Sequence, residues 1–421
     1  MYRTVSNVGE QIKSAEQYVL DHDRANYSPF FETAEKFCAE HSVIIGDKIG
    51  TELLLGIPLS KDSFEWCLYT ENAFALAKTL AHRLKQTRAP HVPIDYITVE
   101  TNIPDKELHI CVNVRRLFIV YGVERYRGKR VIDLIPIIKT KGYFGNQIIV
   151  PSANYQLIDI CQTLYTPAKF DNWAKYAQLF KQLTSGTPIV VGGAREQCPD
   201  KRFETVLIED VVNPNGYVAI GDFAIAELTQ CNACRVQFIV DAPIADVARA
   251  IMRAFAYKAG SKITYNEYQL CNISDFRLSK YTFYLVSGEK QLPIADVFNS
   301  ACFELVPFWQ GKKIKKIANP FVLLRFCYID LWMLIILRAL GTQGLDDKMR
   351  VIESNIARMV VLVDSTPTEK LFQMVDYYGV YTDANVAKKR HNKVLGFRPT
   401  YFASGGGCVG TSIESDDIYI V

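Results

Sequence analysis

The chain has 421 residues, of which 49% are apolar and 22% are charged, and its formal net charge is +3. This length favours two or three domains, and the composition excludes a largely disordered chain. The small net charge excludes a protein that coats nucleic acid over its whole surface, so any contact with nucleic acid must be local.

The sequence has no feature of a secreted protein. Its first residues, MYRTVSNVGEQIKSAEQ, are polar and contain no apolar signal-peptide core. The eleven cysteines are an odd number scattered through apolar runs, without the spacing of a disulfide framework. We therefore expect a reduced protein that is not secreted, whose cysteines pack as small core residues.

The first half of the chain alternates helical and strand patterns. In chain order we expect two helices in residues 1–41, a strand at 42–46, a helix at 50–57, a strand at 63–69, a helix at 72–84, three β-rich runs between 94 and 138, and helical residues at 150–183 with a break at Pro167. Residues 185–200 are rich in glycine and proline and give the clearest boundary signal.

From about residue 202 a similar order begins again. The expected elements are strands at 203–212 and 216–222, a helix from 223, a strand at 235–241, a helix at 245–257, and a β-rich stretch between 261 and 307. The apolar segment 321–340 is long enough to span a membrane, but Arg325, Asp330 and Arg338 interrupt it. We therefore predict a core helix there and no contact with a membrane.

Two short stretches echo each other: SVIIGDKIGTELL at residues 42–54 and GYVAIGDFAIAELTQ at residues 216–230. Each predicts a buried strand, a Gly-Asp turn and a helix. An internal duplication is the economical explanation, and the alternative is that two domains share this beginning by chance. The order of elements predicts an α/β (α+β) fold with two tandem domains, mixed sheets with helices on one face, and flanking helices.

We expect four segments along the chain. They are N-terminal helices at 1–41, a first domain with a helical extension and linker at 42–200, a second domain at 201–345, and a helical and loop segment with a Gly-rich tail at 346–421.

The first Gly-Asp turn, Gly46-Asp47, is a candidate nucleotide or phosphate site. Glycine allows a ligand to approach the backbone, and the N-terminus of the following helix offers N–H donors. A carboxylate repels phosphate, however, and Asp47 is also suited to capping the helix. Both interpretations stay open at this point.

The carboxylates that metal-dependent phosphoryl transfer requires are sparse. A two-metal site needs clustered carboxylates, and two of them separated by one residue share one face of a strand. Here Glu65 is matched by Ser63, whereas Asp62 falls on the opposite face. The neighbouring strand offers Glu124 at its end. One aligned carboxylate is a poor cage, so we predict no metal site and no cofactor.

Two basic clusters are candidates for RNA binding. One contains Lys312, Lys313, Lys315 and Lys316, and the other contains Lys388, Lys389 and Arg390. Lysine and arginine supply the salt-dependent, sequence-independent part of nucleic-acid affinity. The alternative is that both clusters are ordinary solvated surface.

Several longer stretches together resemble the poly(A) polymerases of large nucleocytoplasmic DNA viruses, of the asfarvirus and mimivirus type. They are residues 148–183, 217–228, 316–332 and the GGGC run at 405–408. The resemblance implies two nucleotidyltransferase-like domains, the second of them non-catalytic. It also implies a Gly-Gly or Gly-Ser turn, a D-x-D strand and a third Asp in the first domain.

The positions that match these family motifs depart from them. The turn is Gly46-Asp47, the D-x-D position matches residues 63–65, and Val123 stands near the third Asp. The resemblance therefore implies a degenerate active site. It would make the chain a subunit that binds RNA, partners an active poly(A) polymerase or itself as a homodimer, or belongs to the virion. Its expected location is the virion or the viral factory in the host cytoplasm.

Two other functions remain open from the sequence. The first is an active template-independent polynucleotide adenylyltransferase, with Glu65 and Asp62 as catalytic residues binding Mg²⁺ or Mn²⁺ and ATP. The second is a purely structural capsid or core protein without RNA contact.

Overall fold

The structure is a computed structural model. It describes residues 8–58, 65–89, 92, 94, 96–103, 107–113, 115–123, 125–126, 129–166, 172–185, 201–229, 236–240, 242–255, 262–269, 279–287, 290–299, 306–367, 370–371, 377–378 and 418–420. The chain forms two compact units. Unit 1 is Met1–Ser152 with Lys388–Val421, and unit 2 is Ala153–Ala387.

This division falls between Ser152 and Ala153, whereas the boundary signal in the sequence lies at residues 185–200. The helices α4 (Ala153–Tyr165) and α5 (Trp173–Thr184) pack with α10 (Pro320–Ala339) in unit 2. Tyr155 stacks edge-on against Trp332 at 5.4 Å between ring centroids, and Phe180 does the same against Phe321 at 5.6 Å. These two helices therefore belong to unit 2, because they pack against apolar residues that lie far along the chain.

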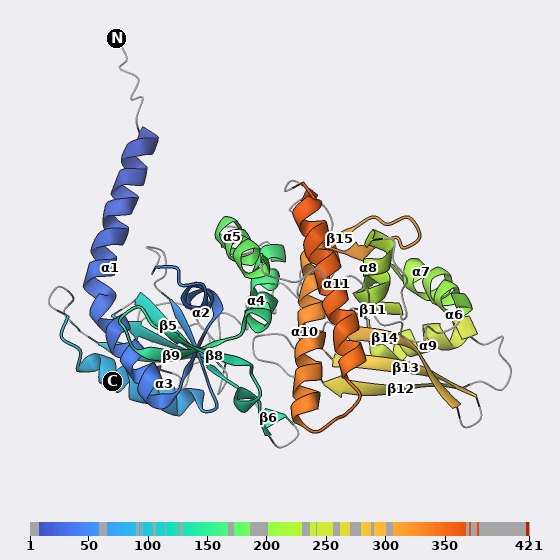
Figure 1. The fold of residues 1–421 in the computed structure, drawn as a ribbon, viewed down its shortest axis with the longest axis horizontal. Helices are drawn as coiled ribbons and strands as arrows, with labels where there is room; N and C mark the ends of the chain where they lie inside the picture. The colour runs from blue at the N-terminus through green and yellow to red at the C-terminus, as the bar shows by residue number, and fades with distance from the viewer. Residues whose placement is uncertain are drawn as a thin grey trace, which may run out of the picture. The chain divides into compact units, whose positions relative to one another are not determined.

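Unit 1 has one large mixed sheet with helices packed on it, and a separate two-stranded sheet of β6 and β7 (Figure 1). Its helices and strands are α1 (Val8–His41), β1 (Ile44–Gly46), α2 (Asp47–Leu54), β2 (Trp66–Thr70), α3 (Ala73–Lys85), β3 (Ile97–Ile103), β4 (Glu107–Val112), β5 (Arg115–Gly122), β6 (Arg125–Tyr126), β7 (Lys129–Arg130), η1 (Val131–Asp133), β8 (Ile137–Lys141), β9 (Gln147–Pro151) and β18 (Ile418–Ile420). The sheet order is β18-β3-β4-β5-β2-β1-β9-β8.

Residues 8–41 form one helix, where two helices were expected within residues 1–41. Helix α1 runs through Pro29 without ending, and Figure 1 shows its N-terminal part extending beyond the sheet. Its C-terminal part belongs to the core of unit 1, where Phe30, Phe31 and Phe37 are buried. The segment is therefore part of the first unit and not a separate helical region.

A buried carboxylate holds α1 against the turn between β8 and β9. Glu35 is 0% exposed, and its oxygens accept hydrogen bonds from the backbone N–H groups of Phe144 and Asn146 at 3.1 Å. The side-chain amide of Asn146 donates a further bond at 3.0 Å. The turn also needs Gly142, because a Cβ there would lie 2.3–2.5 Å from the Glu35 carboxyl group.

Unit 2 is a second mixed sheet with its own helices. Its elements are α4, α5, α6 (Lys201–Val206), the π-helical turn η3 (Leu207–Val212), α7 (Asn213–Asn215), β10 (Val218–Ile220), α8 (Gly221–Thr229), β11 (Val236–Val240), α9 (Ile244–Phe255), β12 (Lys262–Gln269), β13 (Ser279–Ser287), β14 (Lys290–Asn299), β15 (Val306–Trp309), β16 (Ile317–Ala318), α10, α11 (Asp346–Ser365) and β17 (Tyr377–Tyr378). The sheet order is β12-β13-β14-β11-β10-β16-β15-β17.

Residues 203–212 were expected to form a strand and are helical instead. Their buried side chains are Phe203, Leu207, Ile208, Val211 and Val212, which recur at helical spacing. The β-branched residues in this run favour a strand by local propensity, but burial of one helical face overrides that weak preference.

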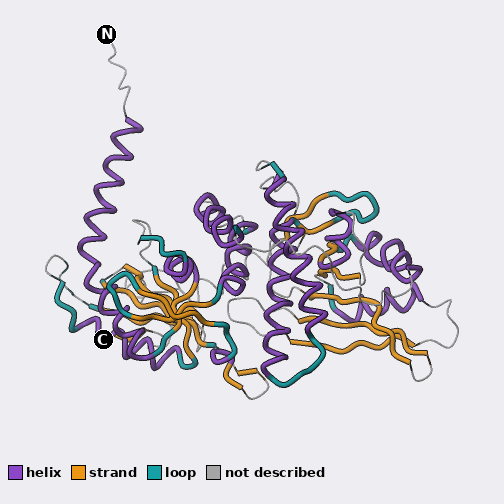
Figure 2. The backbone as a smooth tube through the Cα atoms, viewed as in Figure 1, coloured by secondary structure: helices purple, strands orange, loops and turns teal. Residues whose placement is uncertain are grey.

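Helix α10 is the core helix that the sequence predicts. It begins at Pro320 after Asn319, whose side chain accepts from the N–H of Phe321 at 2.9 Å. By length and composition it is the one described helix that could cross a membrane, and 72% of its most apolar window is buried within the protein. It runs beside α11 in Figure 2.

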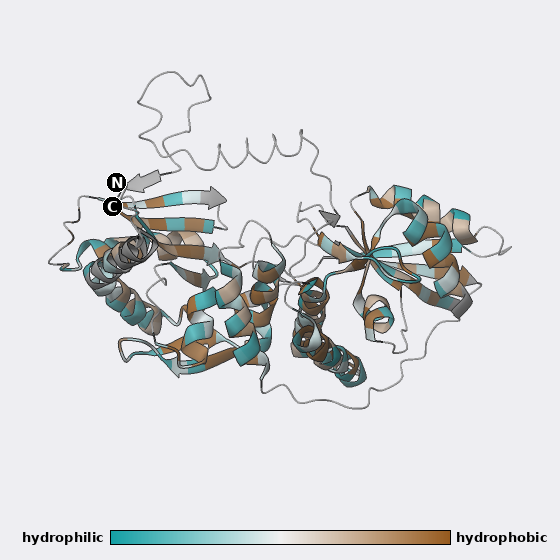
Figure 3. Cartoon of the chain, turned by 90° about the horizontal axis from the view of Figure 1, so that it is seen from above, coloured by the Kyte–Doolittle hydropathy of each residue, from teal (hydrophilic) through white to brown (hydrophobic). Residues whose placement is uncertain are grey.

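The two sheets have the same order over seven strands. The run β3-β4-β5-β2-β1-β9-β8 in unit 1 corresponds to β12-β13-β14-β11-β10-β16-β15 in unit 2. The directions also correspond, since the successive pairings in both runs are antiparallel, antiparallel, parallel, antiparallel, parallel and antiparallel. Helices of both units carry hydrophilic and hydrophobic residues along their length in Figure 3.

Candidate functional site

The candidate site of unit 1 lies on the sheet face opposite its hydrophobic core. Trp66 and Leu68 of β2 point into that core, so Cys67 between them points to the other face. The strand register places Gly46, Ile119 and His109 in one row with Cys67. We call these four residues the site row of unit 1.

The corresponding row of unit 2 has different chemistry. The same strand pairings bring Ile220, Gln237, Asp296 and Thr282 into register. Position by position, Cys67 corresponds to Gln237, Ile119 to Asp296, and His109 to Thr282. We call these residues the site row of unit 2.

The two Gly-Asp turns are related with a shift of one residue. Asp47 is the first residue of α2 and has φ +53°, while Gly221 is the first residue of α8 and has φ +63°. Asp47 therefore corresponds in structure to Gly221, although the sequence aligns Gly46 with Gly221. Aspartate is among the few residues that tolerate this left-handed conformation.

Close packing explains why residue 46 is a glycine, so a bound ligand is not needed to explain it. A Cβ on Gly46 would lie 2.0 Å from a ring carbon of buried Tyr69. Gly46 holds the N-cap position of α2 and Asp47 is the first helical residue, which corrects the expected capping role of Asp47. The Sγ of Cys67 donates to Oδ2 of Asp47 at 3.6 Å, so this carboxylate contacts the site row.

Glu65 is held by an arginine from the neighbouring strand β5. Nε and Nη2 of Arg116 both lie 2.8 Å from its Oε2, and both side chains are half-exposed. No local pattern in the sequence predicts this pair, because the two residues are 51 positions apart. Asp62, Ser63, Phe64 and Glu124 lie outside the described residues.

The described residues of unit 1 do not form a metal cage. Ile119 stands beside Cys67 where a carboxylate of the neighbouring strand would be needed, and Val123 is buried. His109 and Glu107 form a buried contact at 2.8 Å. Within the part of the chain that the structure describes, no group of three His, Cys, Asp or Glu residues is placed to hold a metal ion.

The buried thiol of Cys111 on the same sheet face is protonated at neutral pH. Burial, together with the nearby Glu100 carboxylate, raises the pKa of Cys111 to about 12. A protonated, buried thiol is neither a metal ligand nor a nucleophile.

The site row of unit 2 is joined by hydrogen bonds around a buried carboxylate. Asp296 is 1% exposed, accepts from the Thr282 hydroxyl at 2.7 Å, and lies 3.4 Å from the Lys280 ammonium. Gln237 donates to Asp296 at 3.4 Å and accepts from the backbone N–H of Asp222 at 3.0 Å. The sequence analysis did not single out Asp296. The only hint of it in the sequence is that it is the one acidic residue within the apolar strand β14.

Four of the predicted RNA-binding lysines lie on one hairpin, residues 310–316 between β15 and β16, which we call the lysine hairpin. Lys312, Lys313 and Lys315 are exposed, and Ile314 between them is 0% exposed. Lys388, Lys389 and Arg390, the second predicted cluster, lie outside the described residues.

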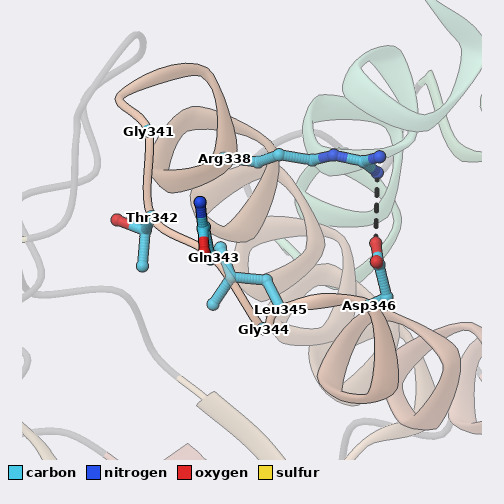
Figure 4. A pocket seen from close by; sticks show the side chains of 7 residues that line it. All are labelled: Arg338, Gly341, Thr342, Gln343, Gly344, Leu345 and Asp346. Atoms are coloured by element: carbon cyan, nitrogen blue, oxygen red, sulfur yellow. Dashed lines mark ion pairs between the residues drawn. The ribbon is translucent and has the colours of Figure 1, made fainter.

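A pocket of about 340 Å³ lies at the turn between α10 and α11 (Figure 4). It is lined by Arg338, Asp346 and the connecting residues 341–345. Arg338 and Asp346 form an ion pair at 3.3 Å with both side chains largely exposed. This lining has no arrangement of nucleophile, base or metal ligand, so we assign no chemistry to it.

Two mixed sheets with repeated strand–turn–helix beginnings define a two-domain, polymerase-like α/β fold. Among solved structures, the chain is similar to the crystal structure of the Megavirus polyadenylate synthase, with a TM-score of 0.67 and 13% sequence identity. The match covers 96% of this chain and 88% of the other. No family model matches the sequence, and no curated protein does. The chain therefore has the fold of a viral poly(A) polymerase.

Proposed function

We propose that the chain is a catalytically inactive, poly(A) polymerase-like viral protein that serves as a binding subunit. The support begins with the fold, which the chain shares with a polyadenylate synthase over nearly its whole length. In that fold class, metal-dependent phosphoryl transfer requires carboxylates that hold divalent cations at the sheet face. The proposal therefore depends on which side chains lie on that face of the sheet in this chain.

One observation supports inactivity most directly. In each unit, a carboxylate of the site face forms an ion pair with an arginine or lysine side chain. In unit 1 the Arg116 guanidinium contacts Glu65, and in unit 2 the Lys280 ammonium contacts Asp296. A protein cation beside a carboxylate opposes metal binding by charge, since the carboxylate is already neutralised. The apolar Ile119 in the site row of unit 1 adds no ligand.

The role that fits an inactive subunit is to hold RNA and to partner an active poly(A) polymerase, a second copy of itself, or virion proteins. The lysine hairpin supports RNA contact, because exposed lysines bind phosphates regardless of sequence. Such a protein would act in the viral factory of the host cytoplasm or in the virion.

We also infer that the two units descend from one duplicated unit. The shared seven-strand order, its directions and the repeated turns support this origin. After duplication the two copies need not keep the same residues at their sheet faces, as the two site rows illustrate.

A primer-extension assay tests the proposed inactivity. The full chain, incubated with ATP, an oligo(A) primer and either Mg²⁺ or Mn²⁺, is expected to add no nucleotides above a no-protein control, because no described carboxylates form a metal cage. An active polyadenylate synthase in the same buffer is the positive control. Extension that Glu65→Gln abolishes would show an active enzyme and contradict the proposal.

A further inference from the structure

The lysine hairpin is held in place by polar side chains of its own unit. Oε1 of Glu227 in α8 accepts from the backbone N–H groups of Lys312 and Lys313 at 3.1 and 3.0 Å. Asn213 accepts from the N–H of Lys315 at 2.9 Å and donates to the carbonyl of Lys313 at 3.0 Å. These bonds fix the backbone, so the exposed lysine side chains project from a preorganised loop.

The corresponding hairpin of unit 1 is held in a similar way without a lysine cluster. Glu52 of α2 accepts from the Tyr143 hydroxyl at 3.3 Å, and Glu35 of α1 binds the backbone N–H groups of the same turn. The fold thus needs an anchored hairpin at this position, but it does not need lysines in the turn, since unit 1 has none at residues 142–146 and carries only Lys139 and Lys141 on the preceding strand. Their concentration in unit 2 therefore points to a ligand and not to folding.

Two aromatic rings lie at the base of the lysine hairpin. Phe308 and Trp309 are the last residues of β15, and both are partly exposed. The Lys316 ammonium lies 4.9 Å from the centroid of the Phe308 ring, and the Lys370 ammonium lies 5.1 Å from the centroid of the Trp309 ring. Rings that accept a cation on one face are also suited to stacking on a nucleobase.

We propose that the lysine hairpin and Phe308 form a binding site for single-stranded RNA. The lysines contact phosphates and the Phe308 ring stacks on an unpaired base, with Lys316 moving from this ring to a neighbouring phosphate. Trp309, the next residue of β15, points to the opposite face of the sheet and lies outside this site. Duplex RNA does not fit this combination, because its bases are already stacked and paired. This proposal rests on the RNA-holding part of the proposed function and specifies which form of RNA is held.

Binding of a labelled oligo(A) strand to the full chain, measured by fluorescence anisotropy at several salt concentrations, tests the lysines. Lys312→Ala with Lys313→Ala is expected to weaken binding at least tenfold at 0.1 M salt and to reduce the salt slope by about 1.4, at about 0.7 per lost phosphate contact on a single strand. The matched control is Lys139→Ala with Lys141→Ala, which removes two exposed lysines from β8, the strand of unit 1 that corresponds to β15. Equal losses in both variants, or no loss in either, would overturn the proposal.

The rings and the anchoring carboxylate give two tests that do not remove positive charge. Phe308→Leu is expected to weaken single-strand binding about tenfold with an unchanged salt slope, and to leave the weak binding of a duplex unaltered. Trp309→Leu, on the opposite face of β15, is the matched control and is expected to leave binding unchanged. Glu227→Ala removes a negative charge beside the lysines yet is expected to weaken binding, because the hairpin loses its anchor. Duplex bound as tightly as single strand, or tighter binding by Glu227→Ala, would contradict the site as described.

The outcomes separate this proposal from the proposed inactivity. A chain that extends primers but loses RNA binding on lysine substitution overturns the inactivity alone. A chain that extends nothing and binds RNA unchanged by these substitutions overturns the lysine-hairpin site alone. Thermal unfolding of each variant establishes that a loss of binding does not come from a loss of fold.

Discussion

Replacing Lys280 with methionine is expected to lower the free energy of unfolding by about 3 kcal/mol, because it leaves the buried Asp296 carboxylate without its cation. The methionine keeps much of the side-chain volume, so the loss reports on charge and not on a cavity. Urea denaturation of the full chain, followed by tryptophan fluorescence, measures this difference.

Two further variants show whether the effect comes from the buried pair. Adding Asp296→Asn to Lys280→Met is expected to recover most of the stability, since asparagine still accepts from Thr282 and carries no charge. The matched control is Arg338→Met, which breaks an ion pair of similar length whose side chains are 63% and 67% exposed. That change is expected to cost less than about 0.5 kcal/mol. Equal costs for Lys280→Met and Arg338→Met would refute the role of Asp296.

Replacing Glu35 with alanine is expected to cost about 3 kcal/mol of unfolding free energy. The change leaves the N–H groups of Phe144 and Asn146 without their carboxylate acceptor at a position that is fully buried. Hydrogen exchange of these two amides is the specific readout, because both should lose protection while the rest of the sheet keeps it.

The control for Glu35 comes from the same helix. Glu32 is exposed and lies one turn earlier in α1, so Glu32→Ala removes the same charge and side chain without a buried contact. Its expected effect is within about 0.5 kcal/mol. If Glu32→Ala and Glu35→Ala destabilise the chain equally, the contact of Glu35 with the β8–β9 turn does not hold unit 1 together.

The fold could be predicted from the sequence in those segments where neighbouring residues form a recognisable pattern. The strand–turn–helix beginnings at Gly46 and Gly221 were found because a short run of consecutive apolar residues followed by Gly-Asp marks each of them. The helical residues 203–212 were assigned to a strand because β-branched side chains suit both states. Packing of α4 against α10 was not foreseen, since contacts between residues so far apart leave no local pattern.

Less of the candidate site than of the fold could be predicted from the sequence. The absence of a D-x-D pair could be noted from residues 63–65, and the expectation that no metal binds there stays a prediction. The pairing of Glu65 with Arg116 and of Asp296 with Lys280 depends on strand register, which the sequence does not specify across long connections. The one-residue shift between the two turns likewise appears only in the backbone angles of Asp47 and Gly221.

We infer that protein cations, Arg116 and Lys280, occupy the carboxylates that would otherwise be available to divalent ions. Titration of Mn²⁺ into the full chain with a non-hydrolysable ATP analogue, followed by the electron paramagnetic resonance signal of free Mn²⁺, tests it directly. We predict that the chain retains no Mn²⁺ beyond that held by the nucleotide alone, and that Glu65→Gln with Asp296→Asn behaves identically. One or two nucleotide-dependent Mn²⁺ ions per chain, lost in that double variant, would contradict this inference.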